Sequence, residues 1–208
     1  TIISGKAQVL LLQKDRKLYD ERVEEVLNTI VKQTRRAADI TKKLTMFSRT
    51  SASPWEKLRL ENILEDTISL IAYQISLEGI EIQKLIAPDL PDFFGNVQEV
   101  REVFLNLILN ALQALAPGGR IHIGITFQKA EEVFVIQVAD TGAGIPPENL
   151  DKVFNPFFTT RPEGTGLGLF VTQQIVHRYG GSIRAERARK KEYAALTRIR
   201  SSRETSAG

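Results

Sequence analysis

The segment best suited to ligand chemistry runs from Asp140 to Pro146 (DTGAGIP) and directly follows an alternating strand pattern. A carboxylate at a strand end, in a turn whose glycines Gly142 and Gly144 permit close backbone approach, accepts a hydrogen bond from a ligand amine such as the adenine amino group. Asp-X-Gly is also common in ordinary turns. Taken alone, the segment fits a base-binding site or a plain turn.

A glycine-rich stretch, 164–169 (GTGLGL), opens a helix that we expect to end near Tyr179. Backbone N–H groups at a helix N-terminus, together with the positive end of the helix dipole, suit phosphate groups. The stretch differs from the dinucleotide-binding fingerprint, because no strand immediately precedes it. On its own it fits a phosphate site or a structural loop.

Two further segments carry polar groups among apolar residues. Asn106 and Asn110 are four positions apart and share one face of a predicted helix. Two amides on an apolar face are costly unless satisfied, so they indicate a ligand or metal, or a pair of core amides bonded to each other. Three phenylalanines in 154–158 (FNPFF) predict an apolar anchor for a loop, or ordinary core packing, and Arg161 beyond them is placed to reach a phosphate.

Composition limits the classes of protein that this chain can represent. Its 208 residues are 42% hydrophobic and 25% charged, which is typical of a globular protein and not of a disordered one. Without cysteine it has neither disulfides nor thiolate metal sites. No apolar run approaches the roughly 20 residues that cross a bilayer. From Arg184 onward eight basic residues face three acidic ones, so the net charge of +3 belongs to the C-terminal stretch.

The elements that must position these groups form two parts. Residues 19–48 contain neither Gly nor Pro, and apolar or small residues from Val23 through Leu27, Ile30 and Leu44 recur at steps of three and four, which predicts one long helix with a narrow seam. With an earlier helix over the first thirteen residues this makes a hairpin. Two such hairpins packed as a four-helix bundle would bury the seam, whereas a lone helix lying on its own globular domain is the alternative.

After a linker that ends at Pro54 the pattern becomes mixed. We expect an α+β arrangement, with an α/β two-layer sandwich of mixed sheet following the helical hairpin. The predicted helices cover about 61–77, 97–116 and 167–179, and the predicted strands cover 80–86, 121–127, 133–138 and 182–185.

Together, the order and spacing of the four segments resemble the sensor histidine kinases of two-component systems, with their GHKL or Bergerat-type ATP-binding catalytic domain. In that family's terms the N box resembles 106–111, the first glycine box 140–146, the F box 154–158 and the second glycine box 164–169. The resemblance covers about 54–187. It implies that 1–53 is the dimerisation and histidine-phosphotransfer hairpin, that 54–187 is the ATP-binding domain and that 188–208 is a basic, atypical tail.

The resemblance also implies roles for individual residues. Asn106 and Asn110 are the implied catalytic residues, Asn110 is the implied Mg²⁺ ligand, and Asp140 binds the adenine amino group. The implied nucleotide-binding residues are Asn110, Asp140, Gly142, Gly144, Thr159, Arg161, Gly164, Thr165, Gly166, Leu167 and Gly168. The implied cofactors are ATP and Mg²⁺. The implied partners are a second copy through the hairpin and the receiver domain of a response regulator, with no nucleic acid and no membrane contact by this chain, in the cytoplasm.

Two features depart from the family pattern. From the resemblance we expect the histidine box of the family to lie just before Thr1, and we expect neither His122, on a polar strand face, nor His177, in a last helical turn, to be a phosphoacceptor. The stretch 186–208 has no clear alternating apolar run, so we expect the last strand of the sheet to be missing, as in a truncated, frameshifted or divergent tail. A basic arm for nucleic acid is the alternative.

The sequence leaves three functions open. A sensor kinase transfers the γ-phosphoryl group to histidine and then to a response regulator aspartate. A related ATPase uses the nucleotide to drive conformational change, but such relatives commonly carry a glutamate four residues before the metal-binding asparagine, and here that residue is Asn106. A non-enzymatic module would only bind nucleotide and dimerise.

Overall fold

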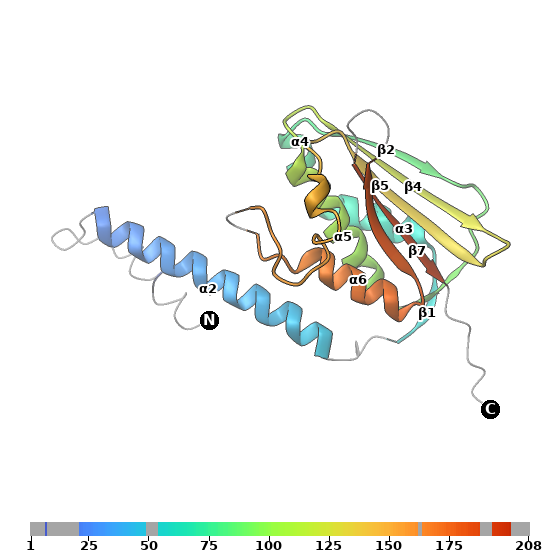
Figure 1. Cartoon of the computed structure of the whole chain (residues 1–208), viewed down its shortest axis with the longest axis horizontal. Helices are drawn as coiled ribbons and strands as arrows, with labels where there is room; N and C mark the ends of the chain where they lie inside the picture. Colours follow the sequence, from blue (N-terminus) through green and yellow to red (C-terminus); the bar gives the residue numbers. More distant parts are fainter. Residues whose placement is uncertain (1–6, 8–20, 49–53, 162–163, 188–192, 201–208) are drawn as a thin grey trace. The chain divides into compact units, whose positions relative to one another are not determined.

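The computed structural model of the chain describes residues 7, 21–48, 54–161, 164–187 and 193–200 (Figure 1). It divides into two compact units, Thr1–Thr50 and Ser51–Gly208. Each is treated by itself below. None of the helices in the described part of the chain has the length and apolar character that a membrane crossing requires.

The first unit contains the long helix that the sequence predicts. Helix α2 spans Glu21–Ser48 without interruption. Three of its large apolar side chains are exposed to solvent, namely Val23 (41%), Val26 (56%) and Ile30 (37%). The first predicted helix, apart from Ala7, lies outside the described residues, as does the side chain of Leu44. The described part of α2 therefore presents apolar surface that its own unit does not cover.

A five-stranded mixed sheet forms the base of the second unit. Its strands are β2 (Glu81–Ile86), β4 (Arg120–Gln128), β5 (Val133–Asp140), β6 (Ser182–Arg187) and β7 (Tyr193–Arg200). The spatial order is β2-β4-β5-β7-β6, in which only β2 and β4 run parallel. This confirms the predicted mixed sheet and the four predicted strands.

Helices cover one face of this sheet, as Figure 1 shows. They are α3 (Leu60–Leu70), α4 (Ala72–Leu77), α5 (Val97–Ala114) and α6 (Gly168–Arg178). Alternate residues of β4, namely Ile121, Ile123 and Ile125, are fully buried beneath them. Burying each such side chain contributes about 1.5 to 3 kcal/mol, so this alternation fixes which face of the sheet receives the helices.

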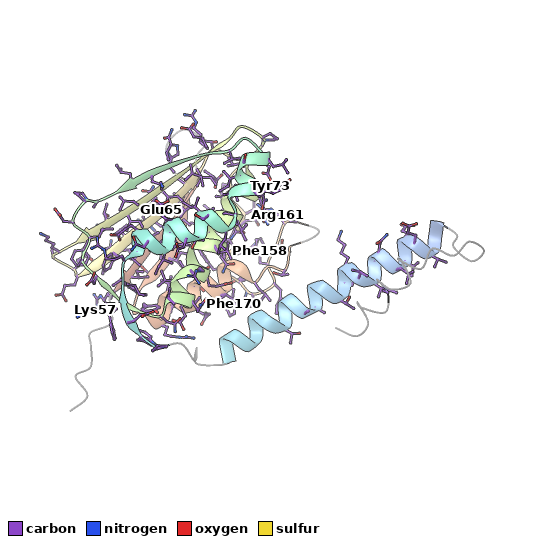
Figure 2. The ribbon with its side chains drawn as sticks, turned by 180° about the vertical axis from the view of Figure 1, so that it is seen from behind. Lys57, Glu65, Tyr73, Phe158, Arg161 and Phe170 are labelled. Carbon is purple, nitrogen blue, oxygen red and sulfur yellow. The ribbon has the colours of Figure 1, made fainter. Side chains whose placement is uncertain are left out.

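The single helix predicted over 61–77 is wrong in one respect, because it is broken at Ile71 into α3 and α4. Thr67 donates its hydroxyl hydrogen to the backbone oxygen of Ile63, and Ser69 does the same to Glu65. Such bonds to the preceding turn bend helices. Beyond the break, Tyr73 is 82% exposed and stands out from α4 (Figure 2).

A two-stranded antiparallel sheet, absent from the sequence-based prediction, closes the end of the unit near the linker. It pairs β1 (Glu56–Leu58) with β3 (Phe93–Gly95). Trp55 packs on Tyr179, with ring centroids 4.9 Å apart. The Tyr179 hydroxyl accepts a hydrogen bond from the backbone N–H of Asn96 at 2.9 Å, and burial raises the pKa of this phenol. These contacts fasten the start of α5 to the end of α6.

The expectation that the last strand is missing is wrong. Strand β7 lies inside the stretch 188–208 that the sequence assigned to a tail, and it pairs along its whole length with β5 and over residues 193–198 with β6. Its side chains facing the helices include Ala195, Thr197 and Ile199, and Thr197 is completely buried. The domain boundary predicted at residue 187 therefore falls inside the sheet, which continues through β7 to Arg200.

Candidate functional site

The two asparagines of the N box lie on α5 beside the start of α6. Asn106 is only 6% exposed, and its amide Nδ2 donates a hydrogen bond to Oε1 of Glu102 at 3.1 Å. A Cβ atom added to Gly168 would lie 3.3 Å from Oδ1 of Asn106 and 4.0 Å from Nδ2 of Asn110. A glycine at the first residue of α6 thus lets the N-terminus of that helix approach both amides.

The carboxylate of Asp140 ends β5 and is held by the turn that follows. Its Oδ1 accepts a hydrogen bond from the backbone N–H of Gly142 at 2.9 Å. A Cβ atom on Gly142 would lie 2.3 Å from the backbone oxygen of Ala114, which also accepts a hydrogen bond from Ala143 at 3.2 Å. Because only glycine fits at 142, the turn packs directly on the C-terminal end of α5.

The second glycine box packs on the F box through backbone atoms. Phe157 donates its N–H to the backbone oxygen of Gly166 at 3.0 Å. Gly166 has a φ of +65°, and a Cβ atom there would lie 2.4 Å from the carbonyl carbon of Phe157. Helix α6 begins just after Leu167 with no side-chain cap. Its first N–H groups can therefore bind an anionic ligand.

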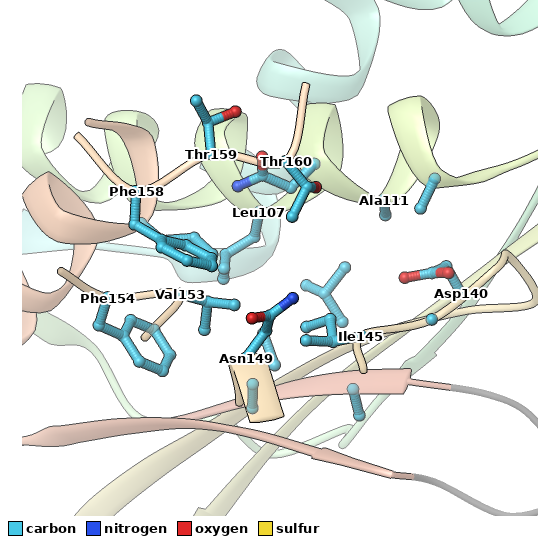
Figure 3. Close-up of a pocket in the computed structure, with 18 of the residues that line it drawn as sticks. Leu107, Ala111, Asp140, Ile145, Asn149, Val153, Phe154, Phe158, Thr159 and Thr160 are labelled. Atoms are coloured by element: carbon cyan, nitrogen blue, oxygen red, sulfur yellow. The ribbon is translucent and has the colours of Figure 1, made fainter. Parts of the chain in front are cut away.

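These segments surround a cavity of about 200 Å³ (Figure 3). Leu107, Asn110 and Ala111 of α5 form one wall, and Ile145 and Asn149 lie across from them with Asp140 at one end. Phe154 and Phe158 of the F box lie toward the other end. The sheet contributes Val138, Ala185, Ala194 and Ala195. The cavity thus joins an apolar slot to a few polar groups, which is typical of small-molecule sites.

The predicted site residues fall into two groups. Those that line the cavity are Asn110, Asp140, Gly144, Thr159 and Arg161. Those that do not line it are Asn106, Gly142, Gly164, Thr165, Gly166, Leu167 and Gly168, which belong to the surrounding turns and to α5 and α6. Sequence reasoning missed Asn149, the small floor residues Ala185 and Ala195, and the role of Phe158 as cavity wall.

Arg161 lies at the Asp140 end of the cavity. Its guanidinium donates to Oε1 of Gln113, the last residue but one of α5, and Nη2 lies 3.5 Å from the backbone oxygen of Asn110. Partial burial lowers the pKa of Arg161, while the negative charge of Asp140 acts in the opposite direction. Thr159 supports this loop by accepting a hydrogen bond from the backbone N–H of Arg161 at 3.1 Å. Arg161 therefore lies against the C-terminal part of α5, at Asn110 and Gln113.

The described residues offer no site built from protein carboxylates and imidazoles alone, because no three His, Cys, Asp or Glu side chains among them gather to hold a metal. The cavity itself contributes one carboxylate, Asp140, and two amides, Asn110 and Asn149. This donor set suits a ligand that brings most of its own metal-binding oxygens.

Comparison with known proteins places the fold and the cavity in a family. Residues 95–203 match the model of the histidine kinase-, DNA gyrase B- and HSP90-like ATPases. The chain is 30% identical over 184 residues to the signal transduction histidine-protein kinase AtoS of Escherichia coli, a match that covers 88% of this chain and 29% of AtoS. It is 33% identical to sporulation kinase D of Bacillus subtilis, over 89% of this chain and 36% of that kinase. The chain thus spans about a third of these relatives.

Solved structures agree with this family match. The nucleotide-free catalytic domain of the histidine kinase ThkA superposes with a TM-score of 0.66 at 26% identity, covering 71% of this chain and 96% of that domain. Full-length ShkA in complex with AMPPNP, at 19% identity, shares the fold over 95% of this chain and 42% of its own, with a TM-score of 0.74. With the family model matching more than half of its residues, the chain belongs to the histidine kinase-, DNA gyrase B- and HSP90-like ATPase family and carries the catalytic domain of a sensor histidine kinase.

Proposed function

We propose that the chain binds ATP with Mg²⁺ and transfers the γ-phosphoryl group to a histidine on the hairpin of the intact kinase, in the cytoplasm. The observation that supports this most directly is the cavity of the second unit, which has the Asp140 carboxylate at one end and Asn110 beside the uncapped start of α6. From the phosphohistidine the group then passes to an aspartate of a response regulator. In the first transfer the nitrogen–phosphorus bond forms as the bond to the bridging oxygen breaks, and ADP leaves.

The proposed roles follow the positions of the groups. Asp140 accepts a hydrogen bond from the adenine amino group, while Gly142 and Gly144 shape the turn around the base. The backbone of 164–168 and the first turn of α6 bind phosphates through N–H groups. Thr159 and Arg161 belong to the lid that closes over the nucleotide. Catalysis then consists mainly of positioning and charge stabilisation, as is general for phosphoryl transfer.

The residues present fit a nucleotide-borne Mg²⁺. The ion usually keeps waters and is held by one or two protein oxygens together with substrate phosphates. The Oδ1 atom of Asn110 is the proposed protein ligand, and Asn106, oriented by its bond to Glu102, lies one turn away. Bound Mg²⁺ supplies charge neutralisation on the phosphates.

Hydrolysis as the main reaction is less well supported than transfer. Asp140 is the only carboxylate among the described residues that line the cavity, and it lies at the base end. Glu102, the nearest acid along α5, accepts a hydrogen bond from Asn106 and does not line the cavity. No described cavity carboxylate is therefore placed to activate water beside the phosphates.

We also propose that the chain forms a homodimer through its helical unit. The exposed side chains of Val23, Val26 and Ile30 would be covered when α2 packs against a second copy in a four-helix bundle. Replacing Val26 and Ile30 with Asp should then give a monomer that still binds ATP. Sedimentation that shows the unmodified chain to be monomeric at tens of micromolar would refute the dimer.

Calorimetric titration with Mg-ATP tests nucleotide binding. The Asp140→Ala variant should bind at least tenfold more weakly, because a charge-assisted hydrogen bond contributes about 1.5 to 3 kcal/mol. Asp151→Ala is the matched control, since Asp151 is an exposed carboxylate outside the cavity. Equal affinities for the chain and its Asp140→Ala variant would contradict the role of Asp140.

Transfer is tested separately from binding. The chain is mixed with radiolabelled ATP and with a nucleotide-binding-deficient copy of a kinase that carries the complete hairpin histidine. The expected result is an acid-labile label on that partner and none on the chain alone, because His122 on β4 and His177 in α6 both belong to the catalytic unit. Binding without transfer would favour the non-enzymatic module.

A further inference from the structure

Asn149 is a cavity residue that none of the four family-like motifs contains. It ends the short 3-10 turn Pro147–Asn149 that follows the first glycine box. Its backbone N–H donates to the oxygen of Pro146 at 2.8 Å, and its own backbone oxygen accepts from Lys152 and Val153 at 2.9 and 3.0 Å. Hydrogen bonds on both sides therefore fix the backbone of Asn149 and so fix the point from which its side chain extends.

The carboxamide of Asn149 points into the cavity. Figure 3 shows it on the wall opposite Leu107 and Ala111, with Asp140 at the end of the same space. The neighbouring lining residues Ile145 and Val153 are apolar. No hydrogen bond joins this carboxamide to another residue in the part of the chain that the structure describes. A half-buried amide in apolar surroundings is costly when unpaired, so its partner is expected in the ligand.

The chemistry of the amide matches one edge of adenine. A primary carboxamide presents a donor and an acceptor side by side, which pair with N7 and with the 6-amino group of adenine. The amino group has two hydrogens, and the proposed contact with Asp140 uses one of them. The second hydrogen and the N7 lone pair remain available for a group on another wall.

We propose that Asn149 is a second base-recognition residue, which donates to adenine N7 and accepts from the 6-amino group while Asp140 holds the other amino hydrogen. This inference rests on the proposed function, since it concerns the same ATP site. It also gives a physical basis for choosing adenine over guanine. Guanine presents oxygen at position 6, so the acceptor of Asn149 and the carboxylate of Asp140 would both face a second acceptor.

Titrations with ATP and with 7-deaza-ATP, which lacks the N7 acceptor, test the inference. The unmodified chain should bind ATP about tenfold more tightly than 7-deaza-ATP. The Asn149→Ala variant should bind ATP about tenfold more weakly than the unmodified chain and should no longer distinguish the two nucleotides. Glu148→Ala, an exposed change in the same turn, should behave like the unmodified chain.

An Asn149→Asp variant separates recognition from a structural role. Its carboxylate can accept from the amino group but repels the N7 lone pair, so 7-deaza-ATP should bind this variant at least as tightly as ATP. Unchanged ATP affinity in Asn149→Ala, or full discrimination against 7-deaza-ATP in both variants, would overturn the inference and leave ATP binding intact. Absence of ATP binding by the unmodified chain would instead contradict the proposed function itself, and with it this inference.

Discussion

The two ends of the proposed nucleotide site are built from different parts of the polypeptide. At the proposed base end, the side chains of Asp140 and Asn149 provide the polar groups. The Asp140 carboxylate accepts a hydrogen bond from the backbone N–H of Gly142, and the backbone of Asn149 is held by its own hydrogen bonds. At the proposed phosphate end, beside the cavity and not among its lining residues, the candidate groups are the backbone N–H groups of 164–168, which are held by close packing of Gly166 against the F box. One end thus depends on side-chain chemistry and the other on backbone shape.

This difference predicts how substitutions act. A side chain at the base end can be replaced with loss of affinity and little loss of stability. A change at the phosphate end moves the backbone itself, so affinity and stability should fall together. Asp140→Ala and Asn149→Ala test the first statement, and Gly166→Ala tests the second.

The largest effect is expected for Gly166→Ala. The new Cβ atom would overlap the backbone of Phe157 and would also place alanine at a φ of +65°. Together these should lower the free energy of unfolding by about 3 kcal/mol and abolish nucleotide binding. Urea unfolding and calorimetry measure the two effects.

Gly180→Ala is the matched control for that substitution. Gly180 has a similar φ of +61°, yet a Cβ atom there meets nothing within 4 Å. The free energy of unfolding should therefore fall by only about 1 kcal/mol, which is the cost of the conformational strain, and nucleotide affinity should not change. Equal loss of stability in both variants would show that packing of Gly166 on the F box contributes nothing.

A smaller effect, confined to one condition, is expected for Asn110→Ala. If its oxygen is a ligand of the nucleotide-borne Mg²⁺, ATP affinity should fall about tenfold in Mg²⁺ and hardly at all in EDTA. Because Asn110 is a side chain at the phosphate end, stability should remain within about 1 kcal/mol. An identical loss of affinity in both buffers would assign Asn110 a structural role.

The smallest effect is expected for Gln113→Ala. Gln113 is exposed, does not line the cavity, and accepts a hydrogen bond from Arg161 at the base end. Removing this acceptor frees the lid arginine, so ATP should associate about two- to threefold faster. Stopped-flow mixing with a fluorescent nucleotide measures the rate, and slower association would show that this contact helps to form the binding-competent lid.

The sequence predicts those parts of the site that can be recognised from residue types and their spacing. Glycines and acids at fixed spacing locate Asp140 and the phosphate loop, and alternating isoleucines locate β4. Asn149 could not be found in this way, since asparagine is common in turns and only the fold shows where its amide points. The placement of Arg161 near Gln113 likewise depends on contacts between distant segments.

Strand β7 was missed for a physical reason that its position explains. The part of the cavity lining that β7 supplies consists of two small residues, Ala194 and Ala195. Farther along, Thr197 faces the helices where an aliphatic residue would give a clearer pattern. The alternating pattern of β7 therefore lacks large apolar residues in the part of the strand that lines the cavity.

The place of β7 between β5 and β6 also sets the order in which this domain can be completed during synthesis. Strand β6 leaves the ribosome before β7 but has no ladder to β5, so it joins the main sheet only after β7 has inserted between them. The ladder pairs Val133 with Arg200, a contact of high sequence separation that forms late. A nascent or proteolytically clipped chain that stops before Tyr193 already carries all four sequence motifs, yet it lacks Ala194 and Ala195 of the cavity floor. We therefore expect nucleotide binding to require that β7 has docked.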